Sequence, residues 1–149
     1  MGAPEPVHAE TPDHDEAERA QLIAAATQAR ARAYAPYSRF AVGAAVRAEG
    51  RVYAGCNVEN ASYGLTICAE RAAVFAAVAA GARRIDAIAI VTDTPDPTAP
   101  CGACRQVLRE FGPDIRVASA TVHGQVIVRT LSDLLPHAFS PEQLPDRLY

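Results

Sequence analysis

The chain of 149 residues has the length of one domain, and its composition, half apolar and 21% charged, is typical of a globular protein. The net charge of −3 offers no basic surface for nucleic acid. No apolar run reaches the roughly 18 residues of a membrane span, and the first residues lack the pattern of a signal peptide. We therefore expect a cytoplasmic protein that binds neither nucleic acid nor membrane.

The first half of the chain predicts a leader, a helix and a hairpin. Residues 1–14 show no periodicity and are predicted to be a disordered leader, followed by a single domain over 15–149. Apolar residues at helical spacing predict a helix over about 16–35, which Pro36 ends. Residues 41–60 contain two predicted strands around the turn Glu49-Gly50.

The second half alternates helices and strands. Helices are predicted over about 68–80 and 101–111, each followed by glycine, with a β-branched buried strand at 84–93 between them. A strand pair over 115–122 and 125–130 precedes a short helix at 131–135. This order predicts an α/β fold in which helices cover both faces of one mixed sheet.

Three of the four cysteines stand where two predicted helices begin. "ICAER" contains Cys68 and "PCGAC" contains Cys101 and Cys104, and helix N-termini favour thiolates. Three sulfur ligands leave the fourth position of a tetrahedral Zn²⁺ open for water, as in catalytic sites. The pattern therefore predicts one catalytic Zn²⁺ per subunit, with Glu70 close enough to move the protons of that water.

Other interpretations of the cysteines remain open. Cys56 would complete a closed structural site as a fourth ligand, but it falls inside a predicted strand, where a core role is favoured. "CGAC" would also suit a redox dithiol, which leaves Cys68 and Glu70 without a purpose. A third interpretation is that the cysteines are simply buried apolar residues. The open catalytic zinc site explains the most residues.

C-A-E followed at a distance by P-C-x-x-C resembles the all-cysteine signature of zinc deaminases. "CNVENASYGLTICAERAAVFAA" and "PCGACRQVLREF" are similar to the small homotetrameric cytidine deaminases, and the likeness covers roughly residues 18–145. It implies a three-layer α/β/α sandwich with a five-stranded mixed sheet. It also implies a homotetramer with shared active sites that hydrolyses cytidine and 2′-deoxycytidine to uridine and 2′-deoxyuridine in pyrimidine salvage.

The resemblance also implies roles for individual residues. Cys68, Cys101 and Cys104 match zinc ligands, and Glu70 matches the proton shuttle. Among the substrate-binding positions, Asn57 and Glu59 match a ribose-binding pair, and Phe40 matches an aromatic residue near the base. Tyr63 and Phe139 match residues that reach a neighbouring subunit's site, and Ala69 is a further substrate-binding position. Arg71 matches a donor to the ligand thiolates. Three thiolates and Zn²⁺ sum to one negative charge, which a guanidinium would partly withdraw.

Two further functions compete with this one. The chain would fit a deaminase of another aminopyrimidine nucleoside, such as blasticidin S, although the ribose-facing "NVEN" favours an ordinary nucleoside. It would also fit a zinc-stabilised binding module without catalysis. A polynucleotide-editing deaminase is disfavoured by the acidic charge. The helix at about 68–80 is apolar almost all round, which favours an oligomer.

Overall fold

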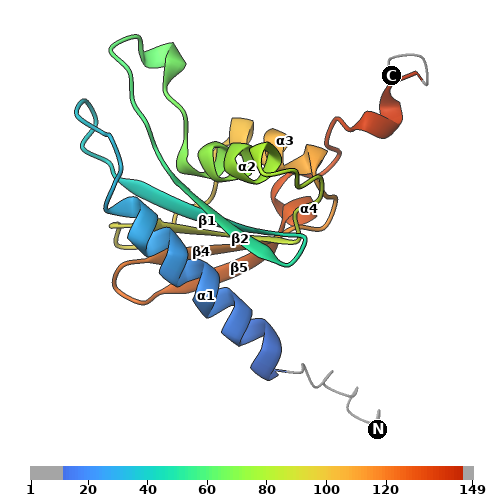
Figure 1. Ribbon diagram of the computed structural model, residues 1–149, viewed down its shortest axis with the longest axis horizontal. Coiled ribbons are helices and arrows are strands. Elements are labelled where there is room, and N and C mark those ends of the chain that lie inside the picture. Colours follow the sequence, from blue (N-terminus) through green and yellow to red (C-terminus); the bar gives the residue numbers. More distant parts are fainter. Residues whose placement is uncertain (1–11, 146–149) are drawn as a thin grey trace, which may run out of the picture.

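The computed structural model describes residues 12–145, in which helices cover both faces of a five-stranded mixed sheet (Figure 1). The strands are β1 (Val42–Ala48), β2 (Arg51–Cys56), β3 (Ala87–Thr92), β4 (Arg116–Thr121) and β5 (Val126–Thr130). The helices are α1 (Pro12–Arg30), α2 (Ala69–Ala79), α3 (Gly102–Glu110) and α4 (Leu131–Leu134), with 3₁₀ turns at Tyr63–Leu65 and Pro141–Gln143. The strand order is β2-β1-β3-β4-β5, and only the β3–β4 pair is parallel. The predicted fold class is confirmed.

The central strand β3 is buried on both faces and separates two cores of different side-chain size. Ile88 and Ile90 point toward α2 and α3, whereas the alternate residues Ala87, Ala89 and Val91 point toward α1. Successive side chains of a strand point to opposite faces, which produces this division. The small residues on one face let α1 lie close to the sheet. None of the described helices is long and apolar enough to cross a membrane.

The hairpin between β1 and β2 forms at the predicted turn. Ala48 pairs with Arg51, so Glu49 and Gly50 are the two turn residues, with φ of 51° and 79°. Positive φ at both positions is the requirement of a type I′ turn, whose twist matches that of the strands. The glycine accepts this conformation without the steric cost of a side chain.

Helix α1 differs from its prediction at both ends. It begins at Pro12, inside the predicted leader, and the rest of that leader, 1–11, lies outside the described residues. It ends at Arg30, not near residue 35. Tyr34 instead pairs with the segment after β2, since its N–H donates to Asn57 O and its carbonyl accepts from Glu59 N–H. These pairings and the restriction that Pro36 places on Ala35 outweigh the local helical preference.

Several chain segments meet at one end of the sheet. The register pairs Val42 at the start of β1 with Thr92 at the end of β3, while Cys56 at the end of β2 lies opposite Gly43. The loops 31–41 and 57–67 project together from this end (Figure 1), and an edge-to-face contact of Tyr37 with Tyr63 joins them. The beginnings of α2 and α3 come to the same end, where they place the cysteines.

Candidate active site

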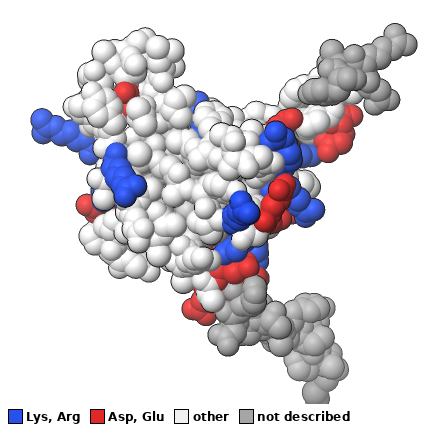
Figure 2. All heavy atoms as spheres, viewed as in Figure 1, with Lys and Arg blue, Asp and Glu red and all other residues white. Residues whose placement is uncertain are grey.

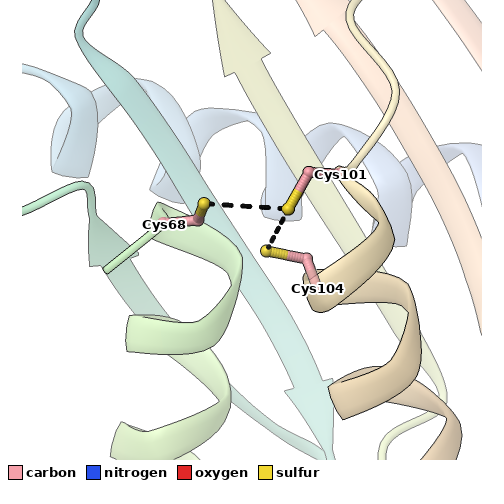
Figure 3. Close-up of side chains that lie close together, drawn as sticks. All are labelled: Cys68, Cys101 and Cys104. Atoms are coloured by element: carbon pink, nitrogen blue, oxygen red, sulfur yellow. Dashed lines mark hydrogen bonds between the residues drawn. The ribbon is translucent and has the colours of Figure 1, made fainter. Parts of the chain in front are cut away.

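The three predicted sulfur ligands come together from two helices (Figure 3). Cys68 is the N-cap of α2 and Cys101 the N-cap of α3, and Cys104 follows one turn later. The Sγ–Sγ distances are 3.9 Å from Cys68 to Cys101 and 3.5 Å from Cys101 to Cys104. Cys56 lies outside this cluster, and its Sγ donates to Arg32 O at 3.5 Å.

This donor set fits a zinc ion. Sulfurs bound at about 2.3 Å to one tetrahedral Zn²⁺ would lie roughly 3.8 Å apart, close to the two observed separations. Cys104 is buried while Cys101 is exposed, so the cluster opens on one side only. Three soft ligands with an open side are the arrangement of a catalytic zinc site rather than a closed structural one.

The cluster favours an anionic sulfur at Cys68. Hydrogen bonding with Cys104, supplemented by Arg71, lowers the pKa of Cys68 to about 5 although burial opposes the change. The same bond to Cys68, together with burial, raises the pKa of Cys104. Zn²⁺ would therefore meet a thiolate at Cys68 and displace the proton of Cys104 on binding.

Arg71 donates from Nη2 to Cys68 Sγ over 3.4 Å, as the sequence predicts for a residue that withdraws charge from the sulfurs. This hydrogen bond raises the pKa of Arg71 further. Its Nε is buried and has no hydrogen-bond partner among the described residues.

Glu70 is buried, with 6% of its surface exposed, in the first turn of α2. Burial is the main cause that raises the pKa of Glu70, and the nearby Cys68 thiolate adds to it. A carboxylate whose pKa is raised is a stronger proton acceptor than an ordinary carboxylate, as a proton-carrying role requires.

A cavity of about 260 Å³ opens beside the sulfur cluster. Its lining includes seven residues that the sequence analysis places in the site: Phe40, Asn57, Glu59, Cys68, Ala69, Glu70 and Cys101. Ala69 is the first residue of α2, where a backbone N–H has no partner within the helix. The cavity therefore combines metal ligands, a buried acid and an apolar wall, as a small-molecule site does.

Asn57 and Glu59 face the same cavity, but the structure uses part of their hydrogen-bonding capacity. Asn57 Oδ1 accepts from Val42 N–H at 2.9 Å, and its Nδ2 donates to Phe40 O at 2.7 Å. Glu59 Oε1 accepts from the N–H groups of Tyr37 and Ser38 at 2.9 and 3.0 Å. Hydrogen bonding with Ser38 lowers the pKa of Glu59. Backbone and side-chain groups of the 31–41 loop therefore hold the Glu59 carboxylate at the wall of the cavity.

Tyr63 and Phe139 do not line this cavity within one chain. They are 73% and 59% exposed, respectively, and they come from the projecting loop and the C-terminal segment. Their contribution to a neighbouring subunit's site stays a prediction.

The sequence analysis missed a cluster of hydroxyl groups in the cavity wall. Thr92 Oγ1 lies 2.7 Å from Thr94 Oγ1, and Thr98 Oγ1 is 3.3 Å from each of them. Thr94 also donates to Asp96 O at 2.7 Å. Thr92 and Thr98 line the cavity. The only available signal was three threonines at the end of a predicted strand and in its proline-rich loop, which indicates a rigid turn but no site.

A larger hollow, about 410 Å³, lies on the opposite face of the sheet between α1 and strands β3–β5. Its lining includes Asp15, Glu18, Arg116 and Val128 but none of the predicted site residues. Arg116 pairs there with Asp15 at 2.7 Å and with Glu18 at 3.6 Å. Size alone would select this hollow, but the chemistry of the side chains selects the smaller cavity.

An α/β/α sandwich whose helix starts supply three zinc-type ligands beside a buried carboxyl group has the arrangement of a zinc-dependent hydrolytic enzyme. Residues 16–123 match the family profile described as "Cytidine and deoxycytidylate deaminase zinc-binding region". The chain belongs to this family.

Named relatives and solved structures agree with that assignment. A cytidine deaminase of Halalkalibacterium halodurans is 52% identical over 131 residues, which cover 87% of this chain and 99% of that protein. One from Mycobacterium tuberculosis is 52% identical over 80% of this chain and 88% of its own. A crystal structure of cytidine deaminase from Burkholderia pseudomallei superposes with a TM-score of 0.78 at 56% identity, covering 80% of this chain and 98% of that one.

Proposed function

We propose that this protein catalyses the hydrolytic deamination of cytidine and 2′-deoxycytidine to uridine and 2′-deoxyuridine, with release of ammonia. The observation that carries the proposal is the placement of buried Glu70 and the three-sulfur cluster beside one cavity, which Asn57 and Glu59 also line. Relatives named cytidine deaminase match most of the chain. A salvage role in the cytoplasm follows from a substrate that is a free nucleoside.

Cys68, Cys101 and Cys104 would hold the zinc ion, which when bound lowers the pKa of water and makes it a nucleophile near neutral pH. Glu70 accepts a proton from the attacking water and places it on N3 of the cytosine ring as the C4–O bond forms. It then takes the remaining hydroxyl proton and delivers it to the exocyclic amine. The C4–N bond breaks, and ammonia and the uracil ring are the products.

The proposed substrate contacts use groups that the fold leaves available. The second carboxylate oxygen of Glu59 accepts a hydrogen bond from a ribose hydroxyl, and the amide of Asn57, held by Val42 and Phe40, borders the same sugar. The Ala69 N–H at the start of α2 donates to an acceptor on the base. Phe40, 41% exposed, offers its ring to the base plane.

We further propose that the active form is a homotetramer in which neighbouring subunits complete each site. Large apolar side chains remain exposed on α2 and the projecting loop, among them Phe75 at 49% and Leu65 at 65%. Tyr63 on the same projecting loop and Phe139 on the C-terminal segment are also exposed, and neither lines the cavity of its own chain. Association would bury this apolar area and bring the two rings to a neighbouring site.

A polynucleotide substrate is not favoured. On the face in Figure 2, the Arg side chains of the described residues lie scattered among Asp and Glu rather than along one stripe. The net charge of the whole chain is negative. Binding to a nucleic acid strand needs a basic surface along its phosphates.

The direct test follows the absorbance change of cytidine on deamination by the purified zinc-loaded protein. Glu70→Gln should retain zinc and fold but lose turnover by a factor of about 10² to 10⁴, because a positioned proton carrier is removed. Blasticidin S and a cytosine-containing oligonucleotide serve as competing substrates. Turnover of the oligonucleotide at the rate of deoxycytidine, or full activity of Glu70→Gln, would contradict the proposal.

A further inference from the structure

Polar side chains along α3 hold the C-terminal segment against the body of the protein. Three contacts join them to residues 134–142: Arg105 Nη1 to Leu134 O at 2.7 Å, Gln106 Nε2 to Phe139 O at 2.9 Å, and Arg109 Nη2 to Glu142 Oε2 at 3.5 Å. Arg105 also donates from Nε to Pro100 O at 2.7 Å, directly before the first cysteine of α3. The same helix therefore carries two sulfur ligands and the anchors of the C-terminal segment.

The backbone on both sides of Phe139 is held, whereas its ring is not covered. The next residue, Ser140, is buried, and its N–H donates to Gln143 Oε1 at 2.9 Å. His137 has a φ of 54°, a left-handed conformation that is uncommon for a residue with a side chain. Such conformations persist where surrounding contacts impose them. The segment is thus fixed in a shape that leaves the Phe139 ring 59% exposed.

We propose that Gln106 is a positioning residue that holds the Phe139 carbonyl so that the ring is presented to the base-binding cavity of a second copy of this chain. This rests on the proposed function, in which Phe139 completes a neighbouring site. Gln106 itself is exposed and does not line the cavity of its own chain. An uncharged amide can donate to a carbonyl without placing a charge beside an apolar ring.

The kinetic test compares Gln106→Ala, Phe139→Ala and the double variant. Loss of one neutral hydrogen bond should raise KM for cytidine about 2- to 10-fold in Gln106→Ala, with kcat and zinc content unchanged. The double variant should match Phe139→Ala alone, because Gln106 acts only through that ring. An additional rise in KM on adding Gln106→Ala to Phe139→Ala, or loss of zinc from Gln106→Ala, would overturn the proposal.

Two further variants separate positioning from a general effect on α3. Gln106→Glu keeps the length and helical preference of the side chain but replaces the N–H donor by a carboxylate that repels the Phe139 carbonyl, so it should raise KM at least as much as Gln106→Ala. Wild-type kinetics of Gln106→Glu would overturn the proposal. Gln28→Ala makes the same change at an exposed glutamine of α1, and should leave KM unchanged.

A measurement independent of activity separates this proposal from the proposed function. The chain contains four phenylalanines, so labelling with 4-fluorophenylalanine should produce four ¹⁹F resonances. The Phe139 signal is assigned by its loss in Phe139→Leu, and it should shift or broaden in Gln106→Ala while the other three stay in place. An unchanged Phe139 signal overturns the positioning role, whereas absence of cytidine turnover in the wild-type protein overturns the proposed function alone.

Discussion

The pKa values of Cys68 and Glu70, only two residues apart, move in opposite directions. Hydrogen bonds with Cys104 and Arg71 lower the pKa of the Cys68 thiol, whereas burial raises that of the Glu70 carboxyl group. The first environment supplies donors to the anion, and the second removes water from it. These opposite shifts support the proposed roles of Cys68 as a zinc ligand and Glu70 as a proton carrier.

Metal content should distinguish the clustered cysteines from Cys56. Cys101→Ala removes a ligand and should abolish stoichiometric zinc, with partial unfolding of the α3 start, because the site's binding energy is lost. Cys56→Ala should keep one zinc per chain, since its sulfur lies outside the cluster and donates to Arg32 O. Elemental analysis after dialysis measures both, and loss of zinc from Cys56→Ala would rule out the three-sulfur site.

Glu59→Gln should weaken the proposed contact with the sugar while keeping the hydrogen bonds that Glu59 accepts from the backbone. The remaining amide oxygen can still accept from Tyr37 and Ser38, while the negative acceptor facing the cavity is lost. We expect KM for cytidine to rise about 10- to 100-fold, as for a hydrogen bond to a charged group, with an unchanged unfolding temperature. Glu49→Gln makes the same change at a carboxylate that accepts a hydrogen bond from Arg83 N–H and does not line the cavity, so it should leave KM for cytidine unchanged. Equal KM values in the two variants would exclude Glu59 from sugar binding.

At the scale of elements, close packing of α1 on the sheet positions the loop that borders the cavity. Gly43 on β1 faces the helix, where an added Cβ would lie 1.9 Å from Ala26 O and 2.6 Å from Arg30 N. Arg30 at the end of α1 donates from Nε to Ala41 O, just before β1. Helix α1 can therefore lie this close to β1 only because Gly43 has no side chain. This close approach also lets Arg30 hold the segment that leads to Phe40.

Gly43→Ala should destabilise the fold by at least about 1 to 3 kcal/mol, because the atoms it meets are rigid backbone. For a chain of this size that corresponds to a drop of the thermal midpoint by about 2 to 4 °C per kcal/mol. Gly64→Ala is the control, since nothing lies within 4 Å of its added Cβ. Thermal unfolding followed by circular dichroism measures both, and equal midpoints would show that α1 can move away without cost.

For the whole molecule, the exposed aromatic rings pose the main question. Tyr63, Phe75 and Phe139 are between 49% and 73% exposed on one chain. Isolated apolar side chains at a surface are common, but several large exposed rings on one small chain favour an interaction surface. In the proposed tetramer this surface would be buried, and activity would depend on assembly.

Mixing two defective variants tests the shared site. Phe139→Ala lacks the ring, and Glu70→Gln lacks the proton carrier, so neither should turn over cytidine efficiently at low concentration. If subunits exchange, some mixed oligomers contain an intact Glu70 beside a neighbour's intact Phe139, and turnover with low KM should reappear. Native mass spectrometry verifies exchange. Demonstrated exchange without recovery would assign Phe139 to its own subunit.

The sequence by itself determined much of this protein's local structure. Periodicity and turn residues predicted the mixed sheet, the Glu49-Gly50 hairpin and the two helix starts that carry Cys68 and Cys101. These features depend on residues close together in the chain, whose spacing expresses helix or strand geometry directly. The motif spacing also predicted which three cysteines meet.

Only the tertiary structure decided how distant segments share hydrogen bonds. Three sets of hydrogen bonds connect residues at least 15 positions apart. They are the backbone pairing that follows the early end of α1, the bonds of the Asn57 amide to Val42 and Phe40, and the bond from Gln106 to the Phe139 carbonyl. The sequence does not show which group a given backbone donor or acceptor will pair with. Its partner is whichever group the packed fold brings within reach, because a buried polar group left unpaired is costly.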